Sequence, residues 1–229
     1  MTSLAIFGDS HAYVPNLENS HLAWPSKLLE KYPGDNYALY GTSLWYSFEL
    51  FLENYHKYTH VVFVYTSASR IHCLPPHLVS YAFIKTKQPN SASWVDKSHL
   101  SEMEKLWATD KITINEKFDH YLYQKIFDDV NDICFQNNIT LVNILPYENA
   151  GLDDLSTPLN LSKMTGSCIT GIRFVTDNET VQPDKNNIDL RHCHLSNENN
   201  KILFDITYGL LNSKEQCIIH AKEIDKFVK

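Results

Sequence analysis

The sequence predicts an α/β fold built on a parallel sheet, in a single domain that spans residues 1–229. Short, wholly apolar runs have the length and composition of strands that are buried on both faces. Segments with apolar residues at three- and four-residue spacing separate these runs, and such alternation of strands and helices is typical of parallel sheets. A chain of 229 residues is long enough to bury a full core of this class.

The first part of the chain contains three expected strands and two expected helices. The strands are 4–7, 37–40 and 61–65, and the helices are 24–32 and 47–58. Pro25 suits the first turn of a helix, and Pro33-Gly34-Asp35 stops the helical pattern. Apolar residues recur at helical spacing through the second helix, which predicts that one of its faces packs on the sheet.

The rest of the chain alternates between regular and irregular segments. A long amphipathic helix is expected over 116–137, followed by a fourth strand over 140–145. Residues 73–113 and 146–188 show little periodicity, so they are expected to be two irregular insertions within the same domain that help to shape a binding site. Ser196 is a suitable N-cap for a closing helix with an apolar face.

Charge and composition exclude several classes of partner. A formal net charge of −7 and a pI near 5.8 argue against a nucleic-acid-binding surface, which needs lysine and arginine to neutralise phosphates. No apolar run reaches the roughly 18 residues of a membrane span. The five cysteines include no C-x-x-C pair, and the strand-like start differs from a signal peptide, so a cytoplasmic chain with reduced thiols is expected.

Two segments near opposite ends of the sequence supply the groups of a nucleophilic site. Gly8-Asp9-Ser10 directly follows an apolar strand, which places the Ser10 hydroxyl at the carboxyl edge of the sheet, where ligands bind in open parallel sheets. Serine is a poor nucleophile at neutral pH and needs a base within hydrogen-bond reach. Asp189, His192 and His194 supply candidate bases and a carboxylate to orient one of them.

These motifs resemble those of the SGNH (GDSL-type) hydrolases, a family of small serine esterases. The matching blocks are Gly8-Asp9-Ser10, the glycine of Tyr40-Gly41-Thr42, and His194-Leu195-Ser196 ahead of a terminal helix. The resemblance implies a three-layer α/β/α flavodoxin-like fold and hydrolysis of an ester through an acyl-enzyme on Ser10. It also implies an oxyanion hole that includes the backbone amides of Ser10 and Gly41.

The chain departs from the family pattern at two blocks. Where the family has Gly-x-Asn-Asp after its third strand, this chain has Tyr65-Thr66-Ser67-Ala68-Ser69-Arg70, which resembles a divergent branch. In that branch Ser67 takes the place of the oxyanion asparagine and Arg70 enters the site. The family's Asp-x-x-His pattern places an aspartate three residues before the base, but the residue three before His194 is Arg191. Asp189 stands three residues before His192 instead. Either His192 is the base with Asp189 as its orienter, or His194 is the base, oriented by Asp189 at an unusual spacing or by a backbone carbonyl. The Leu-Ser and the helix that follow favour His194.

Further residues are candidates for contact with the substrate, which we expect to be a small-molecule or carbohydrate ester such as an O-acetyl sugar. These candidates are Asp9, His11, Arg70 and His192. His192 and His194 also suggest a metal-dependent hydrolase, but no further ligands are suitably spaced, so neither a metal nor a cofactor is expected. The rival interpretation is a binding or structural protein that kept the scaffold and lost efficient catalysis.

Overall fold

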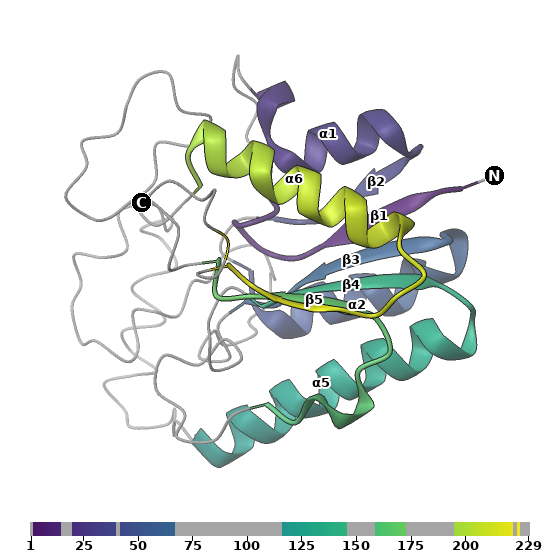
Figure 1. Ribbon diagram of the computed structural model, residues 1–229. Helices are drawn as coiled ribbons and strands as arrows, with labels where there is room; N and C mark the ends of the chain where they lie inside the picture. The colour runs from purple at the N-terminus through teal and green to yellow at the C-terminus, as the bar shows by residue number, and fades with distance from the viewer. Residues whose placement is uncertain are drawn as a thin grey trace, which may run out of the picture.

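A parallel sheet of six strands forms the centre of the computed structural model (Figure 1). The structure describes residues 2–14, 20–39, 42–66, 116–145, 159–172, 195–221 and 224. The strands are β1 (Leu4–Phe7), β2 (Gly34–Asn36), β3 (His60–Val64), β4 (Thr140–Leu145), β5 (Ser167–Thr170) and β6 (Ile218–His220). They lie in the order β2-β1-β3-β4-β5-β6, and every neighbouring pair is parallel. The first five follow the order of flavodoxin-like doubly wound sheets.

Helices cover both faces of the sheet and complete a three-layer fold. On one face lie α1 (Trp24–Lys31) and α6 (Asn197–Asn212), and on the other lie α2 (Leu44–Asn54) and α5 (Glu116–Gln136) (Figure 1). Single 3-10 turns occur at Ser20–Leu22, Tyr55–Lys57 and Leu161–Lys163. The expected α/β/α fold class with a parallel sheet is therefore confirmed.

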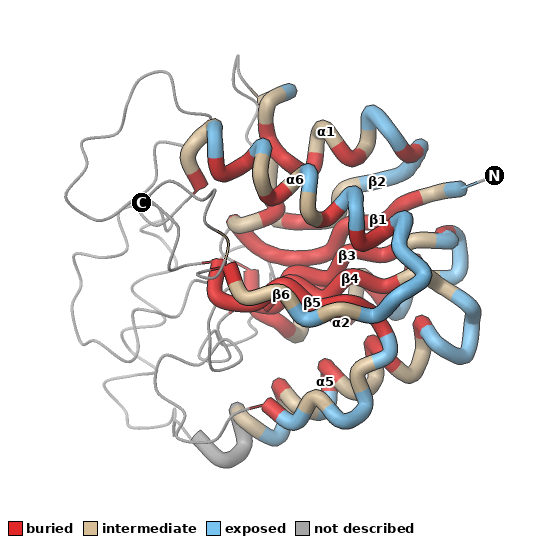
Figure 2. The backbone as a smooth tube through the Cα atoms, in the orientation of Figure 1, coloured by how far each residue is buried: buried red, intermediate tan, exposed pale blue. Residues whose placement is uncertain are grey.

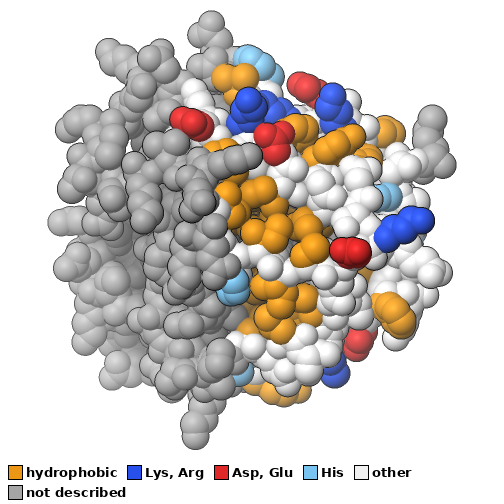
Figure 3. Space-filling view, viewed as in Figure 1, with side chains coloured by type: hydrophobic (Ala, Val, Ile, Leu, Met, Phe, Trp, Pro, Cys, Tyr) orange, Lys and Arg blue, Asp and Glu red, His pale blue; other side chains and the backbone are white. Residues whose placement is uncertain are grey.

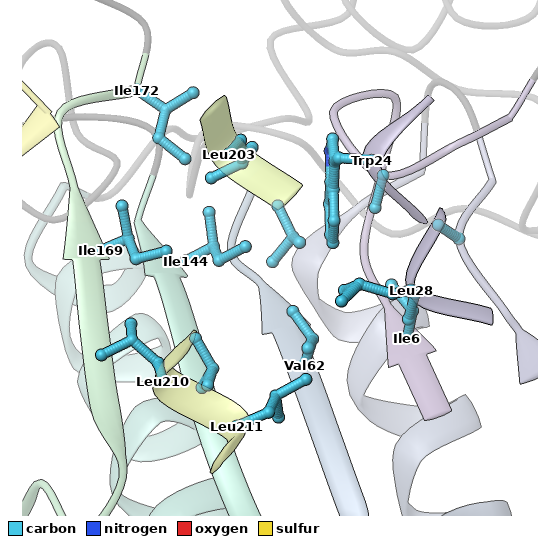
Figure 4. Packing of buried hydrophobic residues seen from close by; sticks show 14 of the residues in the cluster. Ile6, Trp24, Leu28, Val62, Ile144, Ile169, Ile172, Leu203, Leu210 and Leu211 are labelled. Atoms are coloured by element: carbon cyan, nitrogen blue, oxygen red, sulfur yellow. The ribbon is translucent and has the colours of Figure 1, made fainter. Parts of the chain in front are cut away.

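Alternation of side chains along the strands divides the core into two layers, and Figure 2 shows the central strands almost wholly buried. Ile6, Val62 and Ile144 belong to the layer under α1 and α6, where they pack with Trp24 and Leu203 (Figure 4). The intervening strand residues point the opposite way, toward α2 and α5. Burial of both faces explains why these strands are continuous apolar runs rather than alternating ones.

The second strand begins earlier than the sequence suggested. It was expected at 37–40, whereas β2 is Gly34–Asn36 and residues 37–39 lie beyond it. Glycine makes this possible: a Cβ at Gly34 would lie 1.8 Å from the backbone oxygen of Leu4, so the two strands can approach only without one. The polar Gly-Asp-Asn sequence forms a largely exposed edge strand, which a search for apolar runs misses.

Two further strands were not predicted. The segment 146–188 was expected to be irregular, yet β5 lies within it and pairs with β4 from Val142 opposite Ser167 to Leu145 opposite Thr170. All four residues of β5 are buried although two of them are hydroxylic. The last strand, β6, is short and adds to the edge of the sheet beside β5.

The helices agree more closely with expectation. The helix α2 begins at Leu44 rather than at residue 47, because the Ser43 side chain accepts a hydrogen bond from the Tyr46 amide and caps it. Ser196 caps α6 in the same way through the Asn199 amide, as expected. The expected insertion at 73–113 lies outside the described residues. No helix in the described part of the chain is long and apolar enough to cross a membrane.

Candidate active site

Ser10 lies in a tight turn at the carboxyl end of β1. The Asp9 carbonyl accepts hydrogen bonds from the amides of Ala12 (3.0 Å) and Tyr13 (2.9 Å), which closes the turn around Ser10. Ser10 is largely buried, with 8% of its surface exposed. The neighbours of β1 are β2 and β3, so the chain leaves β1 toward one side and returns on the other. Ser10 therefore stands at the topological switch point, where ligands bind in sheets of this kind.

Gly8 allows the turn to begin directly at the end of the strand. Its φ is +156°, and a Cβ there would lie 2.7 Å from the Val64 Cβ and 3.1 Å from the Val64 oxygen. Real Cβ atoms do not come so close to another carbon, so a larger residue would push β1 and β3 apart at this point. Glycine is thus required by close approach as well as by its dihedral angle.

The Asp9 carboxyl group faces the protein interior. It is 1% exposed and accepts hydrogen bonds from the Thr66 hydroxyl at 2.5 Å and from the His11 amide at 3.1 Å. Thr66 follows β3, so this bond ties the Ser10 turn to the end of the neighbouring strand. Buried carboxyl groups are costly unless hydrogen-bonded, which these two donors provide.

A second set of hydrogen bonds connects the Ser10 turn to the C-terminal helix. The Trp24 indole Nε1 donates to the His11 carbonyl at 3.0 Å, and the Trp24 amide donates to Oδ1 of Asn200 at 3.1 Å. Asn200 Nδ2 donates to the Leu195 carbonyl at 3.0 Å and to the Ser196 carbonyl at 3.1 Å. Leu195 is the residue directly after His194 in the chain.

A buried polar network supports the end of β3 from the other side. The Tyr65 hydroxyl donates to Asn143 Oδ1 at 3.1 Å, and Asn143 Nδ2 donates to Asn131 Oδ1 at 3.2 Å. Burial raises the pKa of Tyr65 well above its usual value, which keeps the hydroxyl neutral and able to donate. Tyr65 directly precedes Thr66, so the network supports the backbone next to the residue that donates to Asp9.

The predicted site residues divide into two groups. Asp9, Ser10 and His11 are described and lie together at the carboxyl end of β1. The other predicted residues, Gly41, Ser67, Arg70, Asp189, His192 and His194, lie outside the described residues.

Sequence reasoning missed Thr66, Trp24 and Asn200 as residues around the site. A polar residue at the end of β3 is a signal that could have identified Thr66. Nothing local marks Trp24 or Asn200, because their bond joins positions 176 residues apart.

Metal-binding groups are absent from the described residues. These residues contain no group of three or more His, Cys, Asp or Glu side chains placed to hold a metal ion. On the face shown in Figure 3, the acidic and basic side chains that are drawn in colour are interspersed around hydrophobic ones. The large exposed apolar residues of α6 and β6 include Tyr208 and Ile218.

Comparison with known proteins yields similar structures and no similar sequence. No family model matches the chain, and no curated protein matches it. Similar solved structures include a lipolytic protein of the G-D-S-L family from Desulfitobacterium hafniense, with 12% identity over 92% of this chain and 99% of that chain, and a TM-score of 0.49. The esterase EstA from Pseudoalteromonas has 11% identity over 92% and 97% of the two chains, with a TM-score of 0.48. TesA has 10% identity over 92% and 98%, also with a TM-score of 0.48.

Proposed function

We propose that this chain is a serine ester hydrolase of the SGNH type, with Ser10 as its nucleophile. The observation that carries the proposal is the position of Ser10, in a hydrogen-bonded turn at the carboxyl end of β1 and at the switch point of a doubly wound sheet. A serine held in this way presents its hydroxyl to a bound ligand without needing to reorganise.

The reaction takes place in two steps on Ser10. Its oxygen attacks the ester carbonyl carbon while a histidine removes the hydroxyl proton, and the resulting tetrahedral intermediate expels the alcohol, which takes that proton from the histidine. The acyl-enzyme is then hydrolysed by a water molecule that the same histidine activates. We assign this role to His194 and assign Asp189 to orient it, with His192 as the alternative base.

The negative charge of the tetrahedral intermediate needs hydrogen-bond donors. We assign these to the backbone amides of Ser10 and Gly41 and to the Ser67 hydroxyl. Loss of a single donor of this kind typically lowers the rate about 100- to 1000-fold. If the Ser67 hydroxyl did not replace the asparagine amide as a donor, we would expect weak activity or activity confined to activated esters.

The substrate that we propose is a small-molecule or carbohydrate ester, with an O-acetyl sugar as the first candidate. Arg70, His11 and His192 are assigned to its pocket, since guanidinium and imidazole groups bind sugar and carboxylate oxygens. The buried Asp9 carboxyl is engaged by Thr66 and the His11 amide, which favours a supporting role beneath this pocket.

A second candidate function is a binding protein on the same scaffold. The observation that favours it is the absence of Gly-x-Asn-Asp after β3, where residues 65–70 read Tyr-Thr-Ser-Ala-Ser-Arg. A fold alone does not determine an activity.

Hydrolysis of p-nitrophenyl acetate by the wild type and by Ser10→Ala separates the two functions. We expect turnover by the wild type, loss of turnover in the variant, and labelling of Ser10 by a fluorophosphonate. Circular dichroism establishes that both proteins are folded. A folded wild type that neither hydrolyses esters of several acyl lengths nor becomes labelled would contradict the proposed function. Parallel His192→Ala and His194→Ala variants identify the base.

A further inference from the structure

We infer that Trp24 and Asn200 form a hydrogen-bonded clamp that positions the two halves of the catalytic site relative to each other. The clamp joins the backbone next to Ser10 to the backbone next to His194. Both are positioning residues that act through those two segments. The inference rests on the proposed function, because that function assigns Ser10 and His194 to catalysis.

The first half of the clamp holds the Ser10 turn. Trp24 is the first residue of α1 and is 1% exposed, packed in the core layer with Ile6 and Leu28 (Figure 4). An indole has one polar donor, and here that donor binds the His11 carbonyl at 3.0 Å. A buried, rigid side chain thus fixes the backbone one residue after Ser10.

The second half of the clamp begins at the N-terminus of α1. The first amides of a helix have no acceptor within the helix, and Ala23 at the N-cap position offers no side-chain oxygen. Asn200 Oδ1, from α6, accepts the Trp24 amide at 3.1 Å instead. Asn200 is therefore a cap supplied by another helix, and it joins positions 176 residues apart in the chain.

The amide nitrogen of Asn200 completes the link. It donates to the carbonyls of Leu195 and Ser196, the two residues that connect position 194 to α6. This pattern also determines the orientation of the amide group. A reversed amide would place its oxygen against two carbonyl oxygens and its NH₂ against the Trp24 N–H. One side chain thus satisfies one donor and two acceptors, with 6% of its surface exposed.

The geometry gives the clamp a catalytic rather than a merely stabilising effect. Leu195 directly follows His194 in the sequence, and adjacent Cα atoms are about 3.8 Å apart, so the clamp ends one residue from the proposed base. A misplacement of about 1 Å between catalytic groups can lower a rate about 100-fold. Within the described part of the chain, these side-chain bonds run from the Ser10 turn to Leu195.

The same pair of helices offers a matched control at its opposite end. Asn212, the last residue of α6, donates to the Tyr32 hydroxyl at 2.7 Å, and Tyr32 directly follows α1. Asn200 and Asn212 are twelve residues apart, which corresponds to about 18 Å along a helix. Both asparagines connect α6 to α1, and Asn200 alone of the two also contacts the Leu195 backbone.

The test compares Asn200→Ala, Trp24→Phe, their double variant and Asn212→Ala in the full chain. Hydrolysis of p-nitrophenyl acetate separates kcat from KM, and the rate of fluorophosphonate labelling measures the reactivity of Ser10. We expect kcat and the labelling rate to fall about 10- to 100-fold in Asn200→Ala, with KM changed less than about threefold. Asn212→Ala should remain within about twofold of the wild type at matched stability.

The double variant tests whether both residues act as one unit. Because both bonds belong to a single link, their effects should not add. We expect kcat of the double variant to lie within about twofold of kcat of the slower single variant. Additive losses, or equal rates for Asn200→Ala and Asn212→Ala, would overturn the clamp while leaving the proposed function intact. If Asn200→Ala does not fold, Trp24→Phe alone decides: wild-type kcat in that variant refutes the clamp. A wild type without hydrolysis or labelling refutes the proposed function, and the clamp with it.

Discussion

At the scale of single residues, the bond between Thr66 and Asp9 connects two strand ends at the candidate site. The hydroxyl and the carboxyl oxygen are 2.5 Å apart, and both residues are 1% exposed. Hydrogen bonds in such buried surroundings are electrostatically stronger than in water. The bond therefore holds the Ser10 turn against the end of β3 and limits how far Ser10 can move.

Thr66→Val should both destabilise the protein and slow labelling of Ser10. Valine keeps the shape of threonine but removes the donor, so the buried Asp9 carboxyl loses a partner; we expect a loss of about 2 kcal/mol in the free energy of unfolding. Urea denaturation and fluorophosphonate labelling measure the two effects. Thr66→Ser, which keeps the hydroxyl, is the control and should remain closer to the wild type in both. Equal behaviour of the two variants would show that the hydroxyl is unimportant.

At the scale of elements, a buried asparagine attaches the short strand β5 to the rest of the sheet. Asn131, on α5, is fully buried, and its Oδ1 accepts bonds from the amides of Thr165 and Gly166 at 3.0 and 3.4 Å. The same oxygen accepts the Asn143 side chain of β4. These bonds satisfy the backbone that leads into β5, so a strand of only four residues is held in place.

Asn131→Ala should cost about 3 kcal/mol in the free energy of unfolding, because it removes the acceptor shared by the Thr165 amide, the Gly166 amide and the Asn143 side chain. Asn137→Ala is a suitable control: that asparagine is exposed near the end of α5 and donates a single side-chain bond to the Ile133 carbonyl. We expect the control to change stability by less than about 0.5 kcal/mol. Urea denaturation of both variants measures the difference, and similar midpoints would show that the Asn131 network contributes little.

At the scale of the whole molecule, the core shields two thiols in the layer beneath α2 and α5. Cys134 of α5 and Cys168 of β5 are fully buried. Burial raises the pKa of Cys168 to about 12 and raises the pKa of Cys134 as well, so neither forms a thiolate at neutral pH. Their reaction with a thiol reagent therefore requires opening of the core.

Labelling with iodoacetamide followed by mass spectrometry should show Cys134 and Cys168 protected in the native protein and modified in urea. Their labelling rates should follow the free energy of global unfolding, since both lie in the same core layer. The destabilised Asn131→Ala variant should therefore expose both thiols together. Rapid labelling of either thiol in the stable native protein would contradict a single cooperative core.

Local sequence signals predict the elements that have a continuous apolar run, a helical apolar period or a capping residue within their own sequence. The runs 4–7 and 61–65 are continuous apolar segments, and 140–145 is apolar except at Thr140 and Asn143, because both faces of these strands are buried. The structure confirms the three runs as β1, β3 and β4 to within one residue at each end. Helical periodicity and the Ser196 cap predict α5 and α6 equally well.

The candidate site could be predicted only in part. A glycine followed by Asp-Ser after an apolar strand indicates the position of Ser10, since strand direction alone places such a residue at the carboxyl edge of a parallel sheet. The roles of His194, Asp189 and Ser67 remain predictions. The bond from Thr66 to Asp9 spans 57 positions, so no local pattern could have indicated it.

The sequence by itself determined most of the alternating strands and helices, the position of the Ser10 turn and the start of the closing helix, because hydrophobic periodicity and capping act over a few neighbouring residues. Only the tertiary structure decided that Gly34–Asn36 and Ser167–Thr170 are strands and that Trp24 meets Asn200. The polar edge strand β2, the short buried strand β5 and the inter-helix cap are stabilised by partners that lie far away in the chain. Such pairings form only when the fold brings distant segments together. Their contribution to stability therefore cannot be read from the local amino-acid composition.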